Sequence, residues 1–265
     1  MQAIYGVFCT KYRNFVQNTG VLSKTIGLFR LNDGIRHLLC AKKIVARYGA
    51  TIKKERNYLI FCASFVQMVQ GKELLSEKTG FLLNRWERFR RPDGYFAGSE
   101  KSVASSTYTT FLAAIFYELL GEAERSGTIP SAPILERRRS DGGFVELQPL
   151  RYSGTNPTAA AVGLLTILGV PLPEKEKTVE FLCRCQHPTG GFQAHARIPV
   201  PDLLSSFSAL MALYDLDATD QINRSALRNF ATSLRAPDGG YFGMLPDQQS
   251  DVEYTFYGMA LEAML

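Results

Sequence analysis

The sequence has few of the residues that bind metals or form disulfides. Its 265 residues include three histidines and five cysteines, and the cysteines follow no framework spacing. Secreted domains that depend on disulfides carry even, regularly spaced sets of cysteines. We therefore expect free thiols and a reducing, cytoplasmic environment.

Long apolar runs are also missing, since none reaches the roughly 18 residues that a membrane-spanning helix needs. The opening "MQAIYGVFCTKYRNF" carries charge too early for a signal peptide. We expect no transmembrane segment. The net charge of +5 is modest and the basic residues are scattered, so we do not expect nucleic acid as a partner.

What the chain does have is a turn that returns four times. It reads "RRPDGYFAG" at 90–98, "RRSDGGF" at 138–144, "HPTGGF" at 187–192 and "RAPDGGYFG" at 235–243. One glycine marks each turn: Gly94, Gly142, Gly190 and Gly239. The gaps between these marker glycines are 48, 48 and 49 residues, and that regularity indicates a structural repeat.

An apolar segment follows each turn. Sixteen positions after the marker glycine stands a small hydroxyl residue: Thr110, Thr158, Ser206 or Thr255. The segments that these residues open, such as "TAAAVGLLTILG", are long, rich in alanine and leucine, and apolar on nearly every side. They predict helices buried all round. The short alternating strands of a kelch propeller, which has a similar repeat length, are absent.

A second kind of helix precedes each turn. Residues 173–186 and 218–235 mix charged and apolar residues at three- and four-residue spacing, which is typical of one-sided surface helices. Pro130 and Pro133 leave room for only a short outer helix in the second repeat. The clear repeats span 72–120, 121–169, 170–217 and 218–265. Upstream, 33–49 and 57–71 predict one more outer–inner pair, and 3–17 a sixth inner helix.

This alternation predicts one all-α domain over 1–265, an α/α toroid of the α6/α6-barrel type. Every inner helix follows the same kind of loop, so the inner helices should be parallel, with their N-termini at one rim. Each N-terminus carries partial positive charge and unpaired N–H groups. The rim should therefore attract anions above an apolar cavity, which suits a ligand with an apolar tail and a phosphate head.

The turns "DGYFAG", "SDGGF", "QHPTGGFQ" and "PDGGYFG" resemble those of the prenyltransferase and squalene-cyclase repeat family. The closest resemblance is to the β subunit of the protein geranylgeranyl and farnesyl transferases, over residues 50–265. It implies an isoprenoid diphosphate or other lipid as ligand, prenyl transfer as the activity, and a helical-repeat α subunit or other protein as partner.

The resemblance also implies a zinc site of aspartate, cysteine and histidine, which this chain does not keep. The three positions fall on Asp202, Leu204 and Tyr254. Leucine cannot bind a metal and neutral tyrosine is a poor zinc ligand, so we expect no standard zinc site and no cofactor. Asp202 and Asp251 share one repeat position, four before the hydroxyl residue. They are alternatively a carboxylate-only Mg²⁺ site or ordinary N-terminal carboxylates favoured by the helix dipole.

The diphosphate contacts of the family point to the loop "GGFQAHARIPVPD", which offers His195 and Arg197. Arginine suits bidentate phosphate binding, although both could be ordinary loop residues. Tyr108, Phe207 and Phe256 could line a pocket for a polyene chain, or belong to the core.

Three functions remain open. The first is a prenyltransferase-like enzyme without standard zinc, with Asp202, Asp251 and Tyr254 as candidate catalytic residues. The second is a non-catalytic toroid that binds a lipid or a protein. The third is a small class II terpene cyclase with Asp202 as the acid that protonates an alkene.

Overall fold

The computed structural model of the chain describes residues 76–250 and 252–265. The helices expected at 3–17, 33–49 and 57–71 lie outside the described residues, as does Asp251. The chain divides into two compact units, 1–130 and 131–265, which are described separately below. The expectation of one domain stays a prediction.

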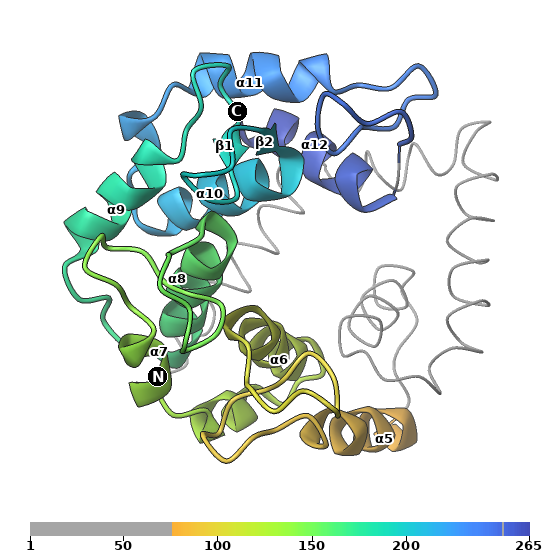
Figure 1. The fold of residues 1–265 in the computed structure, drawn as a ribbon. Coiled ribbons are helices and arrows are strands. Elements are labelled where there is room, and N and C mark those ends of the chain that lie inside the picture. The colour runs from red at the N-terminus through yellow and green to blue at the C-terminus, as the bar shows by residue number, and fades with distance from the viewer. Residues whose placement is uncertain (1–75, 251) are drawn as a thin grey trace. The chain divides into compact units, whose positions relative to one another are not determined.

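The described part of the first unit, residues 76–130, is mainly helical. It contains α5 (Ser76–Glu87), α6 (Thr107–Leu119) and the 3₁₀ helix η1 (Ala123–Thr128), all drawn in Figure 1. Ser106 is the N-cap residue of α6, and its side chain accepts a hydrogen bond from the N–H of Thr109. The fully buried Trp86 and Phe116 stack with their ring centroids 4.7 Å apart, which joins α5 to α6.

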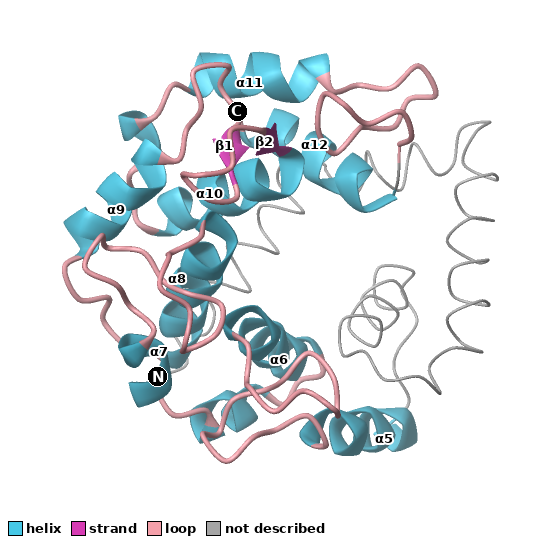
Figure 2. Ribbon diagram, viewed as in Figure 1, coloured by secondary structure: helices cyan, strands magenta, loops and turns pink. Residues whose placement is uncertain are grey.

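The second unit alternates the two expected kinds of helix (Figure 2). Its elements are α7 (Ala132–Glu136), α8 (Thr155–Leu168), α9 (Lys175–Arg184), β1 (Phe192–Gln193), β2 (Pro201–Asp202), α10 (Leu203–Asp215), η2 (Thr219–Gln221), α11 (Arg224–Ser233) and α12 (Val252–Met264). The apolar helices are α8, α10 and α12, and the amphipathic α9 and α11 cover them on the outside (Figure 1). Helix α7 has only five residues, which confirms the short outer helix predicted from Pro130 and Pro133.

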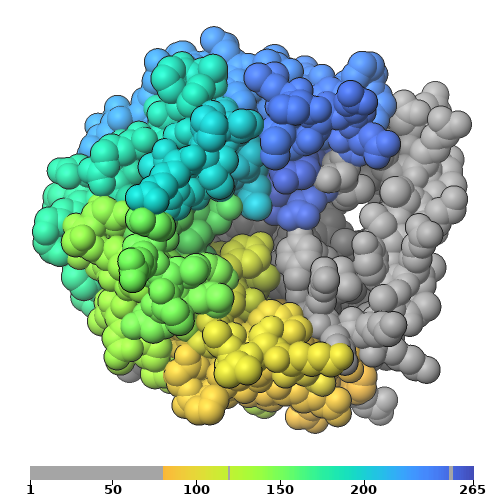
Figure 3. Space-filling view, in the orientation of Figure 1, coloured from red at the N-terminus to blue at the C-terminus, as the bar shows by residue number. Residues whose placement is uncertain are grey.

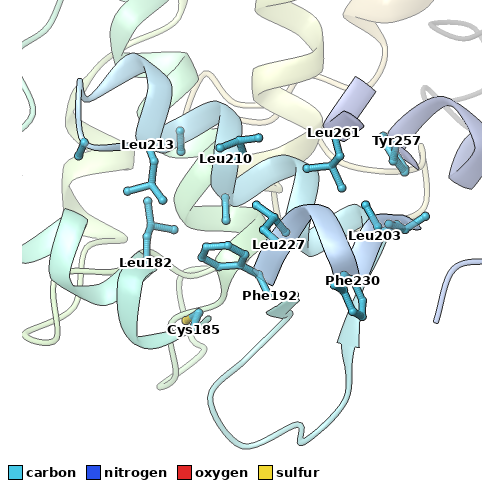
Figure 4. Close-up of a cluster of buried hydrophobic side chains, with 14 of the residues drawn as sticks. Leu182, Cys185, Phe192, Leu203, Leu210, Leu213, Leu227, Phe230, Tyr257 and Leu261 are labelled. Atoms are coloured by element: carbon cyan, nitrogen blue, oxygen red, sulfur yellow. The ribbon is translucent and has the colours of Figure 1, made fainter. Parts of the chain in front are cut away.

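The core of this unit lies between its outer and inner helices. Leu182 from α9, Leu210 and Leu213 from α10 and Leu227 from α11 gather around Phe192 of β1 (Figure 4). All five side chains are buried to 2% exposure or less. The apolar side of each amphipathic outer helix therefore faces the inner helices, as its sequence pattern predicted.

Each repeated turn is a tight hairpin that requires glycine. In the third turn the N–H of Gly190 donates to the carbonyl of His187 (2.8 Å), and the N–H of His187 donates to the carbonyl of Gly191 (2.7 Å). Gly190 has φ = +104°, and an added Cβ would lie 2.0 Å from the carbonyl oxygen of Ala226. The other marker glycines also have positive φ, which confirms the role predicted for them.

The hydroxyl residue sixteen positions after each marker glycine fastens the turn to the inner helix. Thr158 accepts a hydrogen bond from the N–H of Phe144 (2.9 Å), and Ser206 accepts one from the N–H of Phe192 (2.8 Å). Equivalent bonds join Phe96 to Thr110 (3.0 Å) and Tyr241 to Thr255 (3.1 Å). In every repeat a buried N–H of the turn needs an acceptor, and the hydroxyl residue of the inner helix supplies it. This need explains why the hydroxyl residue stands at a fixed spacing from the marker glycine.

The N-terminal ends of the inner helices lie together in the second unit. The N–H of Thr155, at the start of α8, donates to the carbonyl of Ala194 (2.9 Å), just after β1. Strand β1 pairs with β2, which leads into α10. The N–H of Leu203 in turn donates to the carbonyl of Gly243 (2.9 Å), in the loop before α12. The predicted parallel arrangement is confirmed for these helices.

The prediction that the inner helices are buried on every side was wrong for α10 and α12. Helices α10 and α12 each carry a stripe of half-buried side chains at three- and four-residue spacing, whereas six consecutive residues of α8, 160–165, are buried. On α10 this stripe includes Leu204, Phe207 and Met211, and on α12 it includes Phe256 and Met259. Leu204, Phe207, Phe256 and Met259 pack against the buried core and remain partly exposed. The stripes form an apolar surface on which a ligand can lie.

Candidate ligand-binding site

Gly243 brings together the positions at which the resemblance implied zinc ligands. Its carbonyl accepts the N–H of Leu203, next to Asp202 and Leu204. On its other side, a Cβ added to Gly243 would lie 2.7 Å from the ring of Tyr254. The starts of α10 and α12 are therefore neighbours, as the parallel inner helices require.

Asp202 is the N-cap residue of α10. Its Oδ1 accepts the N–H of Ser205 (2.7 Å) and its Oδ2 accepts the hydroxyl of the same residue (2.7 Å). Burial raises the pKa of Asp202 above its ordinary value, although these hydrogen bonds act in the opposite direction. An acid that protonates an alkene must be unusually strong, so the direction of this pKa does not favour the cyclase hypothesis.

The residues at the three implied zinc positions do not fit zinc. Both oxygens of Asp202 serve as cap acceptors, Leu204 has no donor atom, and Tyr254 offers only a phenol. Across 76–250 and 252–265, no three histidine, cysteine, aspartate or glutamate side chains gather as metal ligands would. The carboxylate Mg²⁺ alternative depends on Asp251, outside the described residues.

A cationic and aromatic cluster lies on the loops that lead into α8 and α10. The guanidinium of Arg197 lies over the ring of Tyr152, 3.7 Å from its centroid. The rings of Tyr152 and His195 meet edge to face at 5.7 Å, and Nδ1 of His195 accepts the N–H of Arg197 (3.0 Å). Tyr152 precedes the α8 N-cap, Gly154, by two residues. The predicted pair thus shares one site with a tyrosine from the preceding repeat.

The cluster is open to an incoming ligand. Arg197 is exposed, and its guanidinium makes no hydrogen bond or ion pair with any described residue. Tyr152 is 52% exposed. Figure 3 shows that the loops before α8 and α10, coloured green and cyan, adjoin at the surface. All N–H donors of this guanidinium are available, beside the loop that leads into α8.

Aromatic side chains join the half-buried stripes of α10 and α12. The rings of Phe207 and Phe256 meet edge to face at 5.7 Å, and Phe207 stacks on Tyr257 at 5.2 Å. Tyr254 contacts Tyr257 at 6.1 Å. The structure thus brings the predicted Phe207 and Phe256 together. Tyr108, half-buried on α6, belongs to the first unit and is not placed relative to them.

Two residues near the site were missed in the sequence. Tyr152 stands two positions before a helix start, and an aromatic residue next to Arg151 was the available signal. Asp247 accepts the N–H of Met244 (3.0 Å), and its carboxylate lies 2.8 Å from the position of a Cβ on Gly243, close to Tyr254. Asp247 lies near Tyr254 because both side chains pack closely against Gly243. No spacing in the sequence predicts this contact.

The C-terminal part of the chain is similar to proteins of known family. Residues 158–265 match the family described as the prenyltransferase alpha-alpha toroid domain. The protein farnesyltransferase subunit beta of Pisum sativum is 29% identical over 106 residues. That match covers 38% of this chain and 25% of the relative, so the chain spans about a quarter of the relative's length.

A solved structure, the Candida albicans protein geranylgeranyltransferase-I complexed with GGPP, is 14% identical, with a TM-score of 0.48. The match covers 77% of this chain and 82% of that one. The family match confirms the sequence resemblance and the α/α-toroid fold class. Within the described part of the chain, no helix is both long enough and apolar enough to cross a membrane.

Proposed function

From the match of residues 158–265 to the prenyltransferase α/α-toroid family, we propose that the chain binds an isoprenoid diphosphate and supports prenyl transfer or related isoprenoid chemistry without a zinc thiolate. The observation that carries this proposal is the juxtaposition in the second unit. The guanidinium of Arg197, which has no hydrogen-bond partner among the described residues, lies on the loops that lead into α8 and α10, and the neighbouring helices α10 and α12 carry half-buried aromatic side chains.

The head of the ligand is a diphosphate at Arg197. A guanidinium forms two parallel hydrogen bonds with phosphate oxygens, and the nearby N-terminus of α8 adds partial positive charge. Stacking on Tyr152 holds the guanidinium without using its N–H groups. The neighbouring His195 offers its second ring nitrogen, since Nδ1 already accepts a backbone N–H.

The tail of the ligand lies along α10 and α12. Phe207 and Phe256 present half-buried rings, with Leu204 and Met259 on the same stripes. Burying these side chains under an isoprenoid chain contributes about 25 cal/mol for each Å² of apolar surface removed from water. An apolar wall beside a cationic head matches an amphipathic ligand and disfavours a uniformly polar one.

The same residues suit ionisation of an allylic diphosphate. Arg197 stabilises the negative charge that gathers on the departing diphosphate, which is electrostatic stabilisation of the transition state. The faces of Phe207 and Phe256 stabilise the positive charge left on the prenyl carbon. No step here uses Asp202, because its carboxylate caps α10.

A second function follows from the replaced zinc ligands. Leu204 and Tyr254 stand where two zinc ligands would be needed. No zinc can therefore activate an acceptor thiol at these positions. The toroid would then hold an isoprenoid lipid or a protein without changing it. The two functions differ in whether labelled prenyl groups leave their diphosphate when the protein and an acceptor are mixed.

The proposal extends to partner and compartment. The outer faces of α9 and α11, which expose charged residues such as Lys175 and Arg228, are where we propose that a helical-repeat α subunit packs. We also propose a cytoplasmic location, on the basis of the cysteine usage.

Equilibrium binding tests the head and the tail separately. The full chain is titrated with geranylgeranyl diphosphate and with geranylgeraniol, which lacks the diphosphate. We expect the diphosphate to bind at least tenfold more tightly, and Arg197→Ala to remove that preference, since a charged hydrogen bond contributes about 1.5–3 kcal/mol. Arg228→Ala, on the exposed side of α11, is the matched control and should change nothing. Equal affinity for both ligands would refute diphosphate binding.

A further inference from the structure

The fourth turn lacks the arginine side chain that stabilises the first and second turns. Three positions before the marker glycine stand Arg91 in the first turn, Arg139 in the second, His187 in the third and Ala236 in the fourth. This position looks across the hairpin toward the loop that leads into the inner helix. The residues there differ greatly in size and in hydrogen-bonding capacity.

In the second repeat, one guanidinium ties the hairpin to that loop. Nη2 of Arg139 donates to the carbonyls of Gln148 (2.7 Å) and Leu150 (2.9 Å), and Nε donates to Leu150 as well (3.2 Å). Nη1 donates to the carbonyls of Glu136 (3.0 Å) and Arg138 (3.1 Å). The planar fork thus bridges two segments of backbone.

The first repeat repeats this pattern in detail. Arg91 donates to the loop carbonyls of Ser99 (2.9 Å), Glu100 (3.0 Å) and Ser102 (2.8 Å). It also donates to the carbonyls of Arg88 (3.3 Å) and Arg90 (3.1 Å), on the near side. In both repeats the acceptors include the residues six and four before, and six and eight after, the marker glycine. The backbone of both repeats therefore presents the same four carbonyl groups to a guanidinium.

The fourth repeat keeps the acceptors and has lost the donor. The equivalent carbonyls belong to Ser233, Arg235, Leu245 and Asp247, and no described residue donates a hydrogen bond to them. The loop keeps the same turn, with the N–H of Asp247 on the carbonyl of Met244 at 3.0 Å. In the third repeat, by contrast, Gln193 donates to the loop carbonyl of Ile198 (2.6 Å).

A pocket opens beside Ala236, the position at which the first two turns carry arginine. Its volume is about 390 Å³, and its lining includes Ala236, Asp238, Phe242, Gln248 and Gln249. The lining contains one carboxylate, two amide side chains and no basic residue. Asp238 is held by the N–H of Gly240 (2.9 Å) and the hydroxyl of Ser250 (2.6 Å), so its negative charge is fixed at the wall.

We propose that this pocket binds an arginine side chain supplied by a partner protein. The guest guanidinium takes the place that Arg91 and Arg139 occupy in their own repeats, with its N–H groups on the backbone carbonyls. The carboxylate of Asp238 complements its charge. A lysine ammonium has the charge but not the planar fork, so it cannot bridge both segments of backbone. The site is separate from the diphosphate cluster and does not depend on it.

The test is a titration of the full isotope-labelled chain, followed by NMR. The probes are N-acetyl-arginine amide, its neutral isostere N-acetyl-citrulline amide, and N-acetyl-lysine amide, each at millimolar concentration. We expect the arginine probe to shift backbone amide signals within 236–250, and citrulline and lysine to shift them at least fivefold less. Equal shifts from arginine and citrulline, or none from arginine, would overturn the proposal.

A substitution provides the second readout. Ala236→Arg supplies the missing side chain internally, so it should abolish the response to the arginine probe and raise the melting temperature by about 2–4 °C. If this variant does not fold, Ala236→Leu fills the pocket without hydrogen-bond donors and should abolish the response without raising the melting temperature. Arginine-dependent shifts that persist with the pocket filled contradict the proposal.

Discussion

Replacing Thr158 by valine isolates the bond between turn and inner helix. Thr158 is fully buried at the start of α8. Its Oγ1 accepts the N–H of Phe144 (2.9 Å) and donates to the carbonyl of Gly154 (2.7 Å). Valine has almost the same shape and is also β-branched, so no cavity forms and the side-chain rotamer is preserved.

The magnitude follows from which groups lose a partner. The carbonyl of Gly154 keeps the backbone N–H of Thr158 as a donor (3.0 Å), so it stays satisfied. The N–H of Phe144 loses its acceptor, inside a residue with no exposed surface. Leaving a buried donor unsatisfied costs about 1–3 kcal/mol. For a chain of this size, that lowers the melting temperature by roughly 2–10 °C.

Thr166→Val in the same helix is the matched control. The hydroxyl of Thr166 donates to the carbonyl of Val162 (2.9 Å), and no backbone N–H uses it as an acceptor. We expect its free energy of unfolding to change by less than about 0.5 kcal/mol. Urea denaturation of both variants, monitored by circular dichroism, measures the difference. Equal destabilisation of the two variants would refute the role assigned to the hydroxyl residues of the repeat.

Other predictions concern the turns, the cap and the lipid wall. Gly190→Ala should cost at least about 3 kcal/mol, because its Cβ meets the carbonyl of Ala226 at positive φ. Gly169→Ala, where φ is +65° but no atom lies near the added Cβ, should lower the free energy of unfolding by only about 1–2 kcal/mol. Equal losses for the two variants in urea denaturation would contradict this reasoning. Because burial raises the pKa of Asp202, its ionisation opposes folding, so the stability it contributes is present at low pH and lost as the pH rises through the folded pKa. The free energy of unfolding of the wild type, relative to Asp202→Asn, should therefore fall between about pH 3 and 6; a rise would show that the cap bonds outweigh burial. Phe207→Leu should weaken geranylgeranyl diphosphate binding by roughly three- to tenfold, whereas Tyr214→Leu, on an exposed part of α10, should leave the affinity unchanged in the same titration.

Much of the fold was predictable because its signals are local. Marker glycines such as Gly142 and Gly239 are required by backbone conformation, and that requirement is written in the sequence. The amphipathic pattern of residues 173–186 likewise predicted which helices lie outside. The partner of each hydroxyl residue was not predictable, because the bond from Phe144 to Thr158 joins two elements through their placement in space.

The candidate site was predictable only in part. Arg197 and His195 came from the resemblance, but the contact with Tyr152 depends on how successive repeats pack. The half-buried stripes were missed because an inner helix shows apolar residues on all sides, whether a side faces the core or an open surface. Phe207 and Phe256 were named from residue type alone, and their proximity follows from the neighbouring, parallel α10 and α12.

Photoaffinity labelling tests the central claim most directly. A geranylgeranyl diphosphate analogue with a photoreactive group in its chain is irradiated with the full chain, and labelled peptides are identified by mass spectrometry. We expect labels on the half-buried stripes of α10 or α12, near Phe207 and Phe256, and their loss when unlabelled geranylgeranyl diphosphate competes. Labels confined to the outer helices α9 and α11, or labels that resist competition, would contradict the account.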